Sequence, residues 1–514
     1  MAREKKDPVS KPMKVPGLNT RWYEAHSLAG IFILIPLFVI LVAGTISFYR
    51  NELVVWHTPA LRFEVPEKLD SVDAMLASEI QKVPQDARSL SIYFPTDYSP
   101  AVRLRWFLEG QSDAEELLLN PNNGSLIEEN TVSTKLAMLI YHWHYLRPLP
   151  MGLYISGFIA LLWFAATVSG VYIHRKKLIS QFKGWGGSGA RAFQSWLHTV
   201  AGTLTLPLHF VYGATGALFG LNTIALPLVV ILAFGGDQDK ALQELLGREP
   251  PAEFAGKLVD ALPPLDPFLE AASENIPDDA TLIDLSMQQP FDQAAELHAH
   301  YLEASGERGE VTFGLYEGPE SIQVIGSENA PGGLQVLMMA FQLHFGHIGG
   351  YFGRFIFFLG GILLALLTYA GARLWVIRKK RDLPRATGIF ERLFDGFALG
   401  MLPAIGIYAW ANRLLPYSVP ERGIVEMWIF HGAWVSIGLA IFIFGTGAAC
   451  RKWIFRSSMI LLGLIPVLDG LFQRAWPWSA ASWVAPSFAI TNLVLIASAA
   501  TWLGLTLFRS KALK

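Results

Sequence analysis

Histidine is the residue type whose placement in this sequence points most clearly to chemistry. The chain has twelve histidines. Seven of them lie in or beside four long apolar segments: His26, His144, His174, His198, His209, His344 and His347. Neutral imidazole ligates both zinc and haem iron. Ionisable side chains in a membrane are costly and usually functional, whereas a single histidine near a membrane surface is equally consistent with a hydrogen-bonded anchor. The clustering therefore favours cofactor ligands.

The spacing of these histidines predicts two layers of ligands. One end of the apolar segments carries His26, His174 and His198, and the other end carries His144, His344 and His347. His209 follows His198 by eleven residues, which is about three helical turns, or about 16 Å, along one face of a helix. We therefore expect an inner site built on His198 and an outer site built on His209. The partner of each is left open among the histidines at its own end.

Haem iron is a better candidate than zinc for these ligands. A catalytic zinc site normally uses three close ligands, often with a carboxylate, and the apolar segments contain no histidine and carboxylate group of that kind. Haem iron needs only one or two axial imidazoles. The sequence predicts two b-type haems with two histidine ligands each, drawn from His26, His174, His198, His209 and His344. Arg21 and Arg191 are candidate partners for the propionates, although both also fit anchoring at the membrane surface.

The composition indicates a membrane protein. Of the 514 residues, 52% are hydrophobic and 16% are charged, against about 25% charged in a typical soluble domain. We expect eight membrane-spanning helices, since eight apolar stretches approach or exceed the length of about 20 residues that crosses a bilayer. They are residues 24–49, 149–173, 195–220, 346–377, 393–415, 424–449, 454–473 and 485–508. The single cysteine, Cys450, excludes an internal disulfide and a four-cysteine metal centre.

The distribution of charge predicts the orientation. The tail 1–23, the loop 174–194 and the later connections on the same side are rich in lysine and arginine, so this side is expected to be cytoplasmic. The two long loops on the other side are acidic. Both termini are then cytoplasmic in a bacterial inner membrane. The apolar but short stretch 221–236 is interpreted as a periplasmic or interfacial helix, because a further span would invert the pattern.

The two long loops predict two small α+β domains, at residues 50–148 and within 221–345. Residues 70–83 suit a helix, and residues 89–94 and 101–108 alternate as strands do. The second loop offers a helix near 265–275 and strands near 281–286, 297–303 and 311–315.

An internal duplication relates the two halves of this region. His26 and His198 both open a His-x-x-x-Gly pattern followed by a proline, and His144 and His344 both precede a span that ends in Arg-Lys-Lys. The unit of span, outer domain and span therefore occurs twice. Residues 378–514 break the pattern and are expected to form a separate appendage of four spans.

Three further residue sets carry weaker expectations. His431 is interpreted as an interfacial histidine among aromatic residues. Asp469 is a candidate for a proton path, but a solvated helix end is preferred. Trp106 and Trp143 are candidates for lining a route to the outer haem.

Four segments resemble the PepSY-associated transmembrane helix family, which includes bacterial inner-membrane siderophore reductases. They are WYEAHSLAG (22–30), SGVYIHRKK (169–177), SWLHTVAGTLTLPLHF (195–210) and LHFGHIGG (343–350). The resemblance covers about residues 20 to 380. It implies a four-helix haem-binding core with PepSY-like periplasmic domains and, as in the reductase members, a ferric siderophore as substrate.

The expected function is therefore transfer of electrons across the membrane to a periplasmic ferric siderophore, with release of Fe(II). The expected partners are membrane lipid, the siderophore, and an electron donor that is a quinol, a reduced flavin or another protein; no nucleic acid is expected. Two alternatives remain open at this point. One is a sensor or protease regulator that uses its PepSY domains without redox chemistry, and the other is a transporter of iron chelates.

Overall fold

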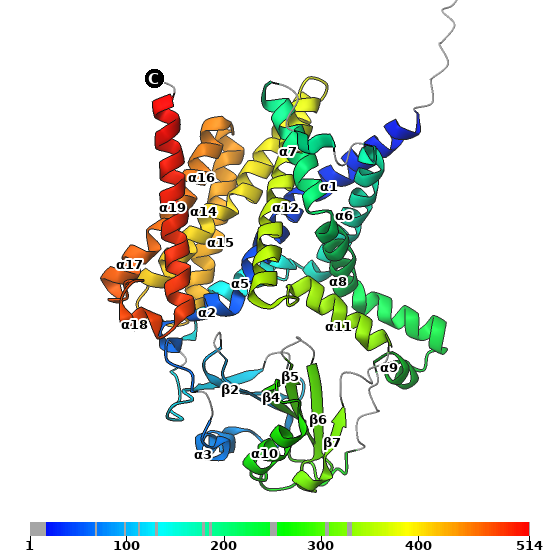
Figure 1. The fold of residues 1–514 in the computed structure, drawn as a ribbon, viewed down its shortest axis with the longest axis vertical. Helices are drawn as coiled ribbons and strands as arrows, with labels where there is room; N and C mark the ends of the chain where they lie inside the picture. Colours follow the sequence, from blue (N-terminus) through cyan, green and yellow to red (C-terminus); the bar gives the residue numbers. More distant parts are fainter. Residues whose placement is uncertain are drawn as a thin grey trace, which may run out of the picture.

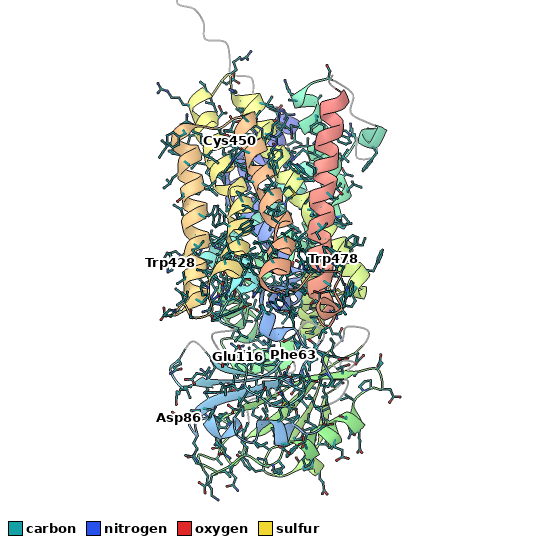
Figure 2. The ribbon with its side chains drawn as sticks, turned by 90° about the vertical axis from the view of Figure 1, so that its left-hand side faces the viewer. Phe63, Asp86, Glu116, Trp428, Cys450 and Trp478 are labelled. Atoms are coloured by element: carbon teal, nitrogen blue, oxygen red, sulfur yellow. The ribbon has the colours of Figure 1, made fainter. Side chains whose placement is uncertain are left out.

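The computed structural model describes residues 17–66, 69–96, 99–111, 114–128, 132–176, 180–183, 188–246, 254–303, 308–325 and 332–512. Figure 1 shows a bundle of long helices above a single β-sheet, and both described ends of the chain lie at the side of the bundle opposite the sheet. Figure 2 shows Cys450 near that opposite side, whereas Trp428 and Trp478 lie at the end of the bundle nearer the sheet.

Eight helices among the described residues are long and apolar enough to cross a membrane, which confirms the expected number. They are α1 (Leu18–Ser47), α6 (Gly152–His174), α8 (Leu206–Phe234), α12 (Gly350–Lys379), the segment Pro384–Leu414, α15 (Arg422–Phe444), the segment Ala448–Phe472 and α19 (Pro486–Ala512). The segment Pro384–Leu414 comprises α13 (Pro384–Leu393), a π-helical turn, η6 (Phe394–Leu399), and α14 (Met401–Leu414). The segment Ala448–Phe472 comprises α16 (Ala448–Gly463) and α17 (Ile465–Phe472).

The third span differs from the expectation at both of its ends. It begins with a separate helix, α7 (Ala190–Leu204), and breaks at Thr205 before α8. Pro207 has no backbone N–H to continue the helix, which explains the break. α8 then runs without interruption to Phe234 and ends at Gly235, whose φ is +63°. Residues 221–234 therefore continue α8 and form no further span, as expected, and their location at the membrane surface stays a prediction.

Short helices with a histidine in their last turn precede the second and fourth spans. α5 (Leu136–His144) precedes α6, and α11 (Gly332–Phe345) precedes α12. The turn between α11 and α12 contains Gly346, Gly349 and Gly350 with φ of 67°, 78° and 60°, a backbone conformation that glycine adopts without steric cost. The fourth span therefore begins at Gly350, and His344 lies on α11 outside it.

The described parts of the two outer segments form one sheet of seven strands in the order β3-β2-β1-β4-β5-β6-β7. The strands are β1 (Ala87–Tyr93), β2 (Val102–Leu108), β3 (Glu115–Leu119), β4 (Thr281–Gln288), β5 (Glu296–Leu302), β6 (Arg308–Gly314) and β7 (Gln323–Ile325). All expected strands are present. The expectation of two separate domains was wrong, because β1 pairs with β4 in antiparallel register from Ser89↔Gln288 to Tyr93↔Asp284. This pairing gives each half a partner for an edge strand that would otherwise expose unpaired backbone groups.

The two halves of the sheet share one hydrophobic core. Leu90 and Leu104 from the first half and Leu285 and Met287 from the second are fully buried in it. Two helices, α3 (Val72–Leu76) and α10 (Asp266–Asn275), cover the face of the sheet that is turned away from the bundle. The expected helix 70–83 is thus only α3 followed by a 3-10 turn, η2 (Ile80–Lys82).

The smaller elements connect the bundle to the sheet. α2 (Arg50–His57) and η1 (Pro59–Leu61) follow α1, and α9 (Gln238–Leu246) follows α8. The remaining short helices are η3 (Ser180–Lys183), η4 (Pro319–Ser321) and α18 (Ala480–Trp483). Within the bundle, α1 packs against α6 and α12, α6 packs against α8, and α7 packs against α12. The first four spans therefore pack together into one core, and the histidines lie in or beside it.

Candidate functional site

Four of the histidines form two pairs. The His26 and His198 rings, from α1 and α7, have their centroids 6.2 Å apart. The His144 and His344 rings, from α5 and α11, have their centroids 5.8 Å apart. The duplicated unit therefore contributes equivalent residues to each pair: the first pair uses the two His-x-x-x-Gly segments, and the second uses the two short helices.

The inner pair is held by backbone carbonyl groups of neighbouring spans. Nδ1 of His26 donates to the carbonyl oxygen of Ala166 at 2.8 Å and lies 3.2 Å from the Ser169 hydroxyl. Nδ1 of His198 donates to the carbonyl oxygen of Leu367 at 3.1 Å. A ligating histidine commonly donates its second ring nitrogen in this way, which fixes the tautomer and directs Nε2 to the metal.

The outer pair is held in the same manner. Nδ1 of His144 donates to the carbonyl oxygen of Ile40 at 3.0 Å. Nδ1 of His344 lies 2.7 Å from the hydroxyl oxygen of Thr215, and this hydroxyl donates to the carbonyl oxygen of Val211 at 2.6 Å. Because the Thr215 proton is used by that carbonyl, Nδ1 of His344 is the donor, and its unprotonated Nε2 keeps the lone pair that a metal ligand needs.

The separation within each pair suits one iron held from both sides. Two imidazoles that ligate a metal through Nε2 have centroids about 6 Å apart, because each bond is about 2 Å and each ring centre lies about 1 Å behind its nitrogen. Both observed separations are close to this value. The described residues contain no group of three His, Cys, Asp or Glu side chains placed to hold a metal ion.

Glycines give the histidine rings their room. A Cβ atom at Gly44 on α1 would lie 2.5 Å from Nδ1 of His144. Cβ atoms at Gly170 and Gly371 would approach the His26 and His198 rings to 3.3 Å and 3.2 Å. These three glycines therefore leave the space that the histidine rings occupy.

Each pair lines a cavity. The inner cavity, of about 130 Å³, contains His26 and His198 in its wall, together with His174 and His209. The outer cavity, of about 400 Å³, is lined by His144, His344 and His347. Trp163 and Leu37 line both cavities, so the two lie in adjacent layers of the core.

The structure does not place His209 beside His144 and His344, because it does not line the outer cavity; its role as a ligand stays a prediction. It lines the inner cavity and packs against Trp163 with ring centroids 5.3 Å apart. The break at Thr205 interrupts the continuous helix on which the expectation depended. His144 and His344 instead meet because they lie on short helices outside the spans.

The remaining predicted residues have mixed outcomes. Arg21 and Arg191 are exposed and line neither cavity, so the structure does not bring them to the histidines. Asp469 is not at a solvated end: it is fully buried and ion-paired with Arg413 at 3.1 Å. Trp106 is buried in the core of the sheet and does not line the outer cavity.

Trp143 and His431 meet away from the outer cavity. Nε1 of Trp143 donates to Nε2 of His431 at 3.1 Å, and Trp143 packs against Trp434. The aromatic setting expected for His431 is confirmed, whereas Trp143 is not among the residues that line the outer cavity.

Sequence reasoning missed two charged residues at the outer cavity. Arg50 and Glu52 on α2 line it, and Glu52 forms an ion pair with Arg354. Arg50 lies 4.7 Å over the Tyr141 ring, which also lines the cavity. The sequence did offer a signal for them, because Arg50 and Glu52 follow the first span directly, at the same end of the bundle as His144. The outer cavity thus has a polar rim with two guanidinium groups.

A cluster of four titratable side chains lies on strands β4, β5 and β6 of the sheet. Nδ1 of His300 is 2.7 Å from Asp284, and Nδ1 of His298 is 2.6 Å from Glu310. Burial lowers the pKa of His300, but hydrogen bonds to Asp284 and Glu310 outweigh it and raise that pKa to about 9. The hydrogen bonds from His298 and His300 hold the pKa of Glu310 well below its usual range. This group stabilises the pairing of β4, β5 and β6.

Comparison with known proteins agrees with this architecture. The family model described as the PepSY-associated TM region matches residues 23–378, which is more than half of the chain. The chain is also 23% identical over 371 residues to an uncharacterized protein of Pseudomonas aeruginosa, PA4219; the match covers 62% of this chain and 88% of that protein. The matched region contains all four paired histidines and the whole sheet, and the chain therefore belongs to the family that carries the PepSY-associated transmembrane region.

Proposed function

We propose that this protein is a haem-containing reductase that passes electrons across a bacterial inner membrane to a ferric siderophore. The observation that carries the proposal is the presence of two histidine pairs with ring separations of 6.2 and 5.8 Å, stacked in adjacent layers of a membrane-spanning core. His26 and His198 would hold one b-type haem and His144 and His344 the other, each through Nε2. When bound, haem supplies reversible one-electron chemistry at its iron.

The proposed orientation places the sheet in the periplasm and both termini in the cytoplasm. It is supported by described basic residues such as Arg378 and Lys379, which lie in the last turn of α12, at the side of the bundle opposite the sheet (Figure 1). Figure 2 shows Cys450, the residue before Arg451 in the sequence, near the same side. The outer pair then lies on the side of the substrate, and the inner pair lies on the side of the cytoplasm.

The outer cavity supports an iron chelate as substrate. Its rim contains Arg50, Asn51 and Arg354, which can donate hydrogen bonds to the oxygen atoms of a chelating group or of a haem propionate. One electron converts Fe(III) to Fe(II), which the chelator binds more weakly, and the metal is released without an acid or base from the protein. The electron enters from a quinol, a reduced flavin or another protein.

The proposal is tested by mixing the dithionite-reduced, purified protein with ferric siderophores and following the optical spectrum. Reoxidation of the protein together with appearance of Fe(II), trapped by a coloured Fe(II) chelator, is the expected result. His300→Ala should behave as the wild type, because His300 lies on the sheet and lines neither cavity, whereas His344→Ala should be slow. A reduced protein that no ferric siderophore reoxidises would refute the assignment of substrate.

A further inference from the structure

We propose that the C-terminal appendage, through its residues 384–512, positions His144 by holding both ends of α5. The appendage lies outside the region that the family model matches, and the duplicated unit does not account for it. The consequence for haem rests on the proposed function, but the mechanical claim does not. Thr134, Glu426 and His431 are assigned as positioning residues, since none of them lines the outer cavity.

The first end of α5 is fastened by a buried polar cluster. Thr134, two residues before α5, donates its hydroxyl to Oε2 of Glu426 on α15 at 2.6 Å. Nδ2 of Asn412 on α14 donates to the same hydroxyl oxygen at 2.8 Å and to Oε1 of Glu426 at 3.3 Å. Nη1 of Arg422 lies 2.8 Å from Oε1 of Glu426. The segment just before α5 is thus hydrogen-bonded to two helices of the appendage, α14 and α15.

The burial of this cluster makes it a demanding constraint. The exposed fraction of the Glu426 side chain is 0% and that of Arg422 is 2%. A buried ion pair is tolerated only with good geometry and with its remaining hydrogen bonds satisfied. Thr134 and Asn412 supply those hydrogen bonds to the carboxylate. A shift of α5 away from α15 would leave the carboxylate without one of its donors, so the cluster resists that shift.

The other end of α5 is fastened by Trp143, the residue next to His144. Its Nε1 donates to Nε2 of His431 on α15 at 3.1 Å, and its ring contacts that of Trp434 edge to face at a centroid separation of 4.6 Å. Both contacts are made with the same helix that holds Thr134. α5 has nine residues, a length at which an isolated helix is only marginally stable in water. Its position therefore depends on these contacts and on its packing against α1.

α2 adds a third attachment on the same side. Nε2 of His57 accepts a hydrogen bond from the backbone N–H of Ala137 in the first turn of α5. Trp56 donates to the Asn492 side chain of α19 at 2.8 Å, and its carbonyl oxygen accepts from Arg413 of α14 at 3.2 Å. The partner histidine, His344, lies on α11, which packs against α8 and α9. The appendage thus holds the half of the outer pair that α5 carries.

Amide hydrogen exchange of the full chain in detergent tests the claim directly. Thr134→Val keeps the shape of the side chain and removes the hydroxyl, and His431→Phe removes the acceptor of Trp143. The matched control is Trp410→Phe, which removes a similar tryptophan N–H bond, to the Leu461 carbonyl oxygen at 2.7 Å, inside the appendage. Loss of one buried hydrogen bond should speed exchange in residues 136–144 about tenfold, which corresponds to about 1.4 kcal/mol.

The outcomes separate this claim from the proposed function. Faster exchange in residues 136–144 for both variants, with residues 190–204 unchanged and the control unchanged in both regions, supports the positioning role. Unchanged exchange in 136–144, or an equal increase in both regions, overturns it. In protein that contains haem, the same variants should shift one of two midpoint potentials and leave the other in place. A wild-type protein without haem would refute the proposed function, while the exchange data would still decide the positioning role.

Discussion

Gly44 offers a sharp test of the outer histidine pair. The residue lies inside α1, and a Cβ atom there would be 2.5 Å from Nδ1 and 2.6 Å from Cε1 of His144. Ordinary contact between such atoms is about 3.5 Å, so Gly44→Ala requires the His144 ring to move by about 1 Å. Movement away from α1 also stretches the 3.0 Å bond from Nδ1 to the Ile40 carbonyl oxygen to about 4 Å, which no longer counts as a hydrogen bond. The variant should lose the fixed direction of Nε2.

The matched variant is Gly170→Ala, at which Cβ would lie 3.3 Å from Cε1 of His26. That contact needs an adjustment of only a few tenths of an ångström. Each substitution replaces a glycine within a helix and by itself favours the helix by about 1 kcal/mol, so general loss of helical structure cannot explain a difference between them. Haem content and the midpoint potentials of the purified variants are the assay. We expect Gly44→Ala to lose or shift one haem and Gly170→Ala to retain two. An unaltered outer signal in Gly44→Ala would refute the placement of His144.

Three other perturbations test the rest of the architecture. Cysteines at Ser91 and Ser286, partners across β1 and β4, should form a disulfide in a Cys450→Ser background, visible as a shift in gel mobility, because paired strands bring Cα atoms to about 5 Å; two independent domains would give none. The raised pKa of His300, about 9, means that its contribution to the unfolding free energy is complete below about pH 6.5 and is lost as the pH rises through 9. The unfolding free energy of the sheet should fall by at most about 1 kcal/mol at high pH, since the ring is partly exposed. His300→Gln should remove this pH dependence. Arg413→Met leaves Asp469 as a buried unpaired charge and should cost about 3–5 kcal/mol of unfolding free energy, with partial recovery when Asp469 is also replaced by leucine.

The spans and the strands were predictable because each is encoded locally. Runs without charge define α1 and α15, and alternation of apolar residues defines β1 and β5. The pairing of β1 with β4 is not local. Either strand shows the same alternation whether its free edge faces solvent or another strand, so two separate domains and one shared sheet give the same pattern.

The set of candidate histidines was predictable because ionisable side chains are costly in membrane-spanning segments, but the pairing of these histidines was not. The outer pair depends on how the chain turns between α5 and α6 and between α11 and α12. The first turn contains Leu146 and Met151 with φ of 56° and 55°, and neither residue type signals a left-handed conformation. The position of Asp469 depended similarly on Arg413, which lies 56 residues earlier. Contacts of this kind are set by packing between helices, which the local sequence does not specify.

The central claim is that two histidine pairs each hold one haem, and quantitation of haem per polypeptide tests it most directly. The purified wild-type protein should contain two b-type haems and give a reduced spectrum with the sharp bands of two imidazole ligands. His198→Ala and His344→Ala should each retain about one haem, and His209→Ala should retain two. A colourless wild-type protein, or loss of a haem in His209→Ala with full retention in His344→Ala, would contradict the account.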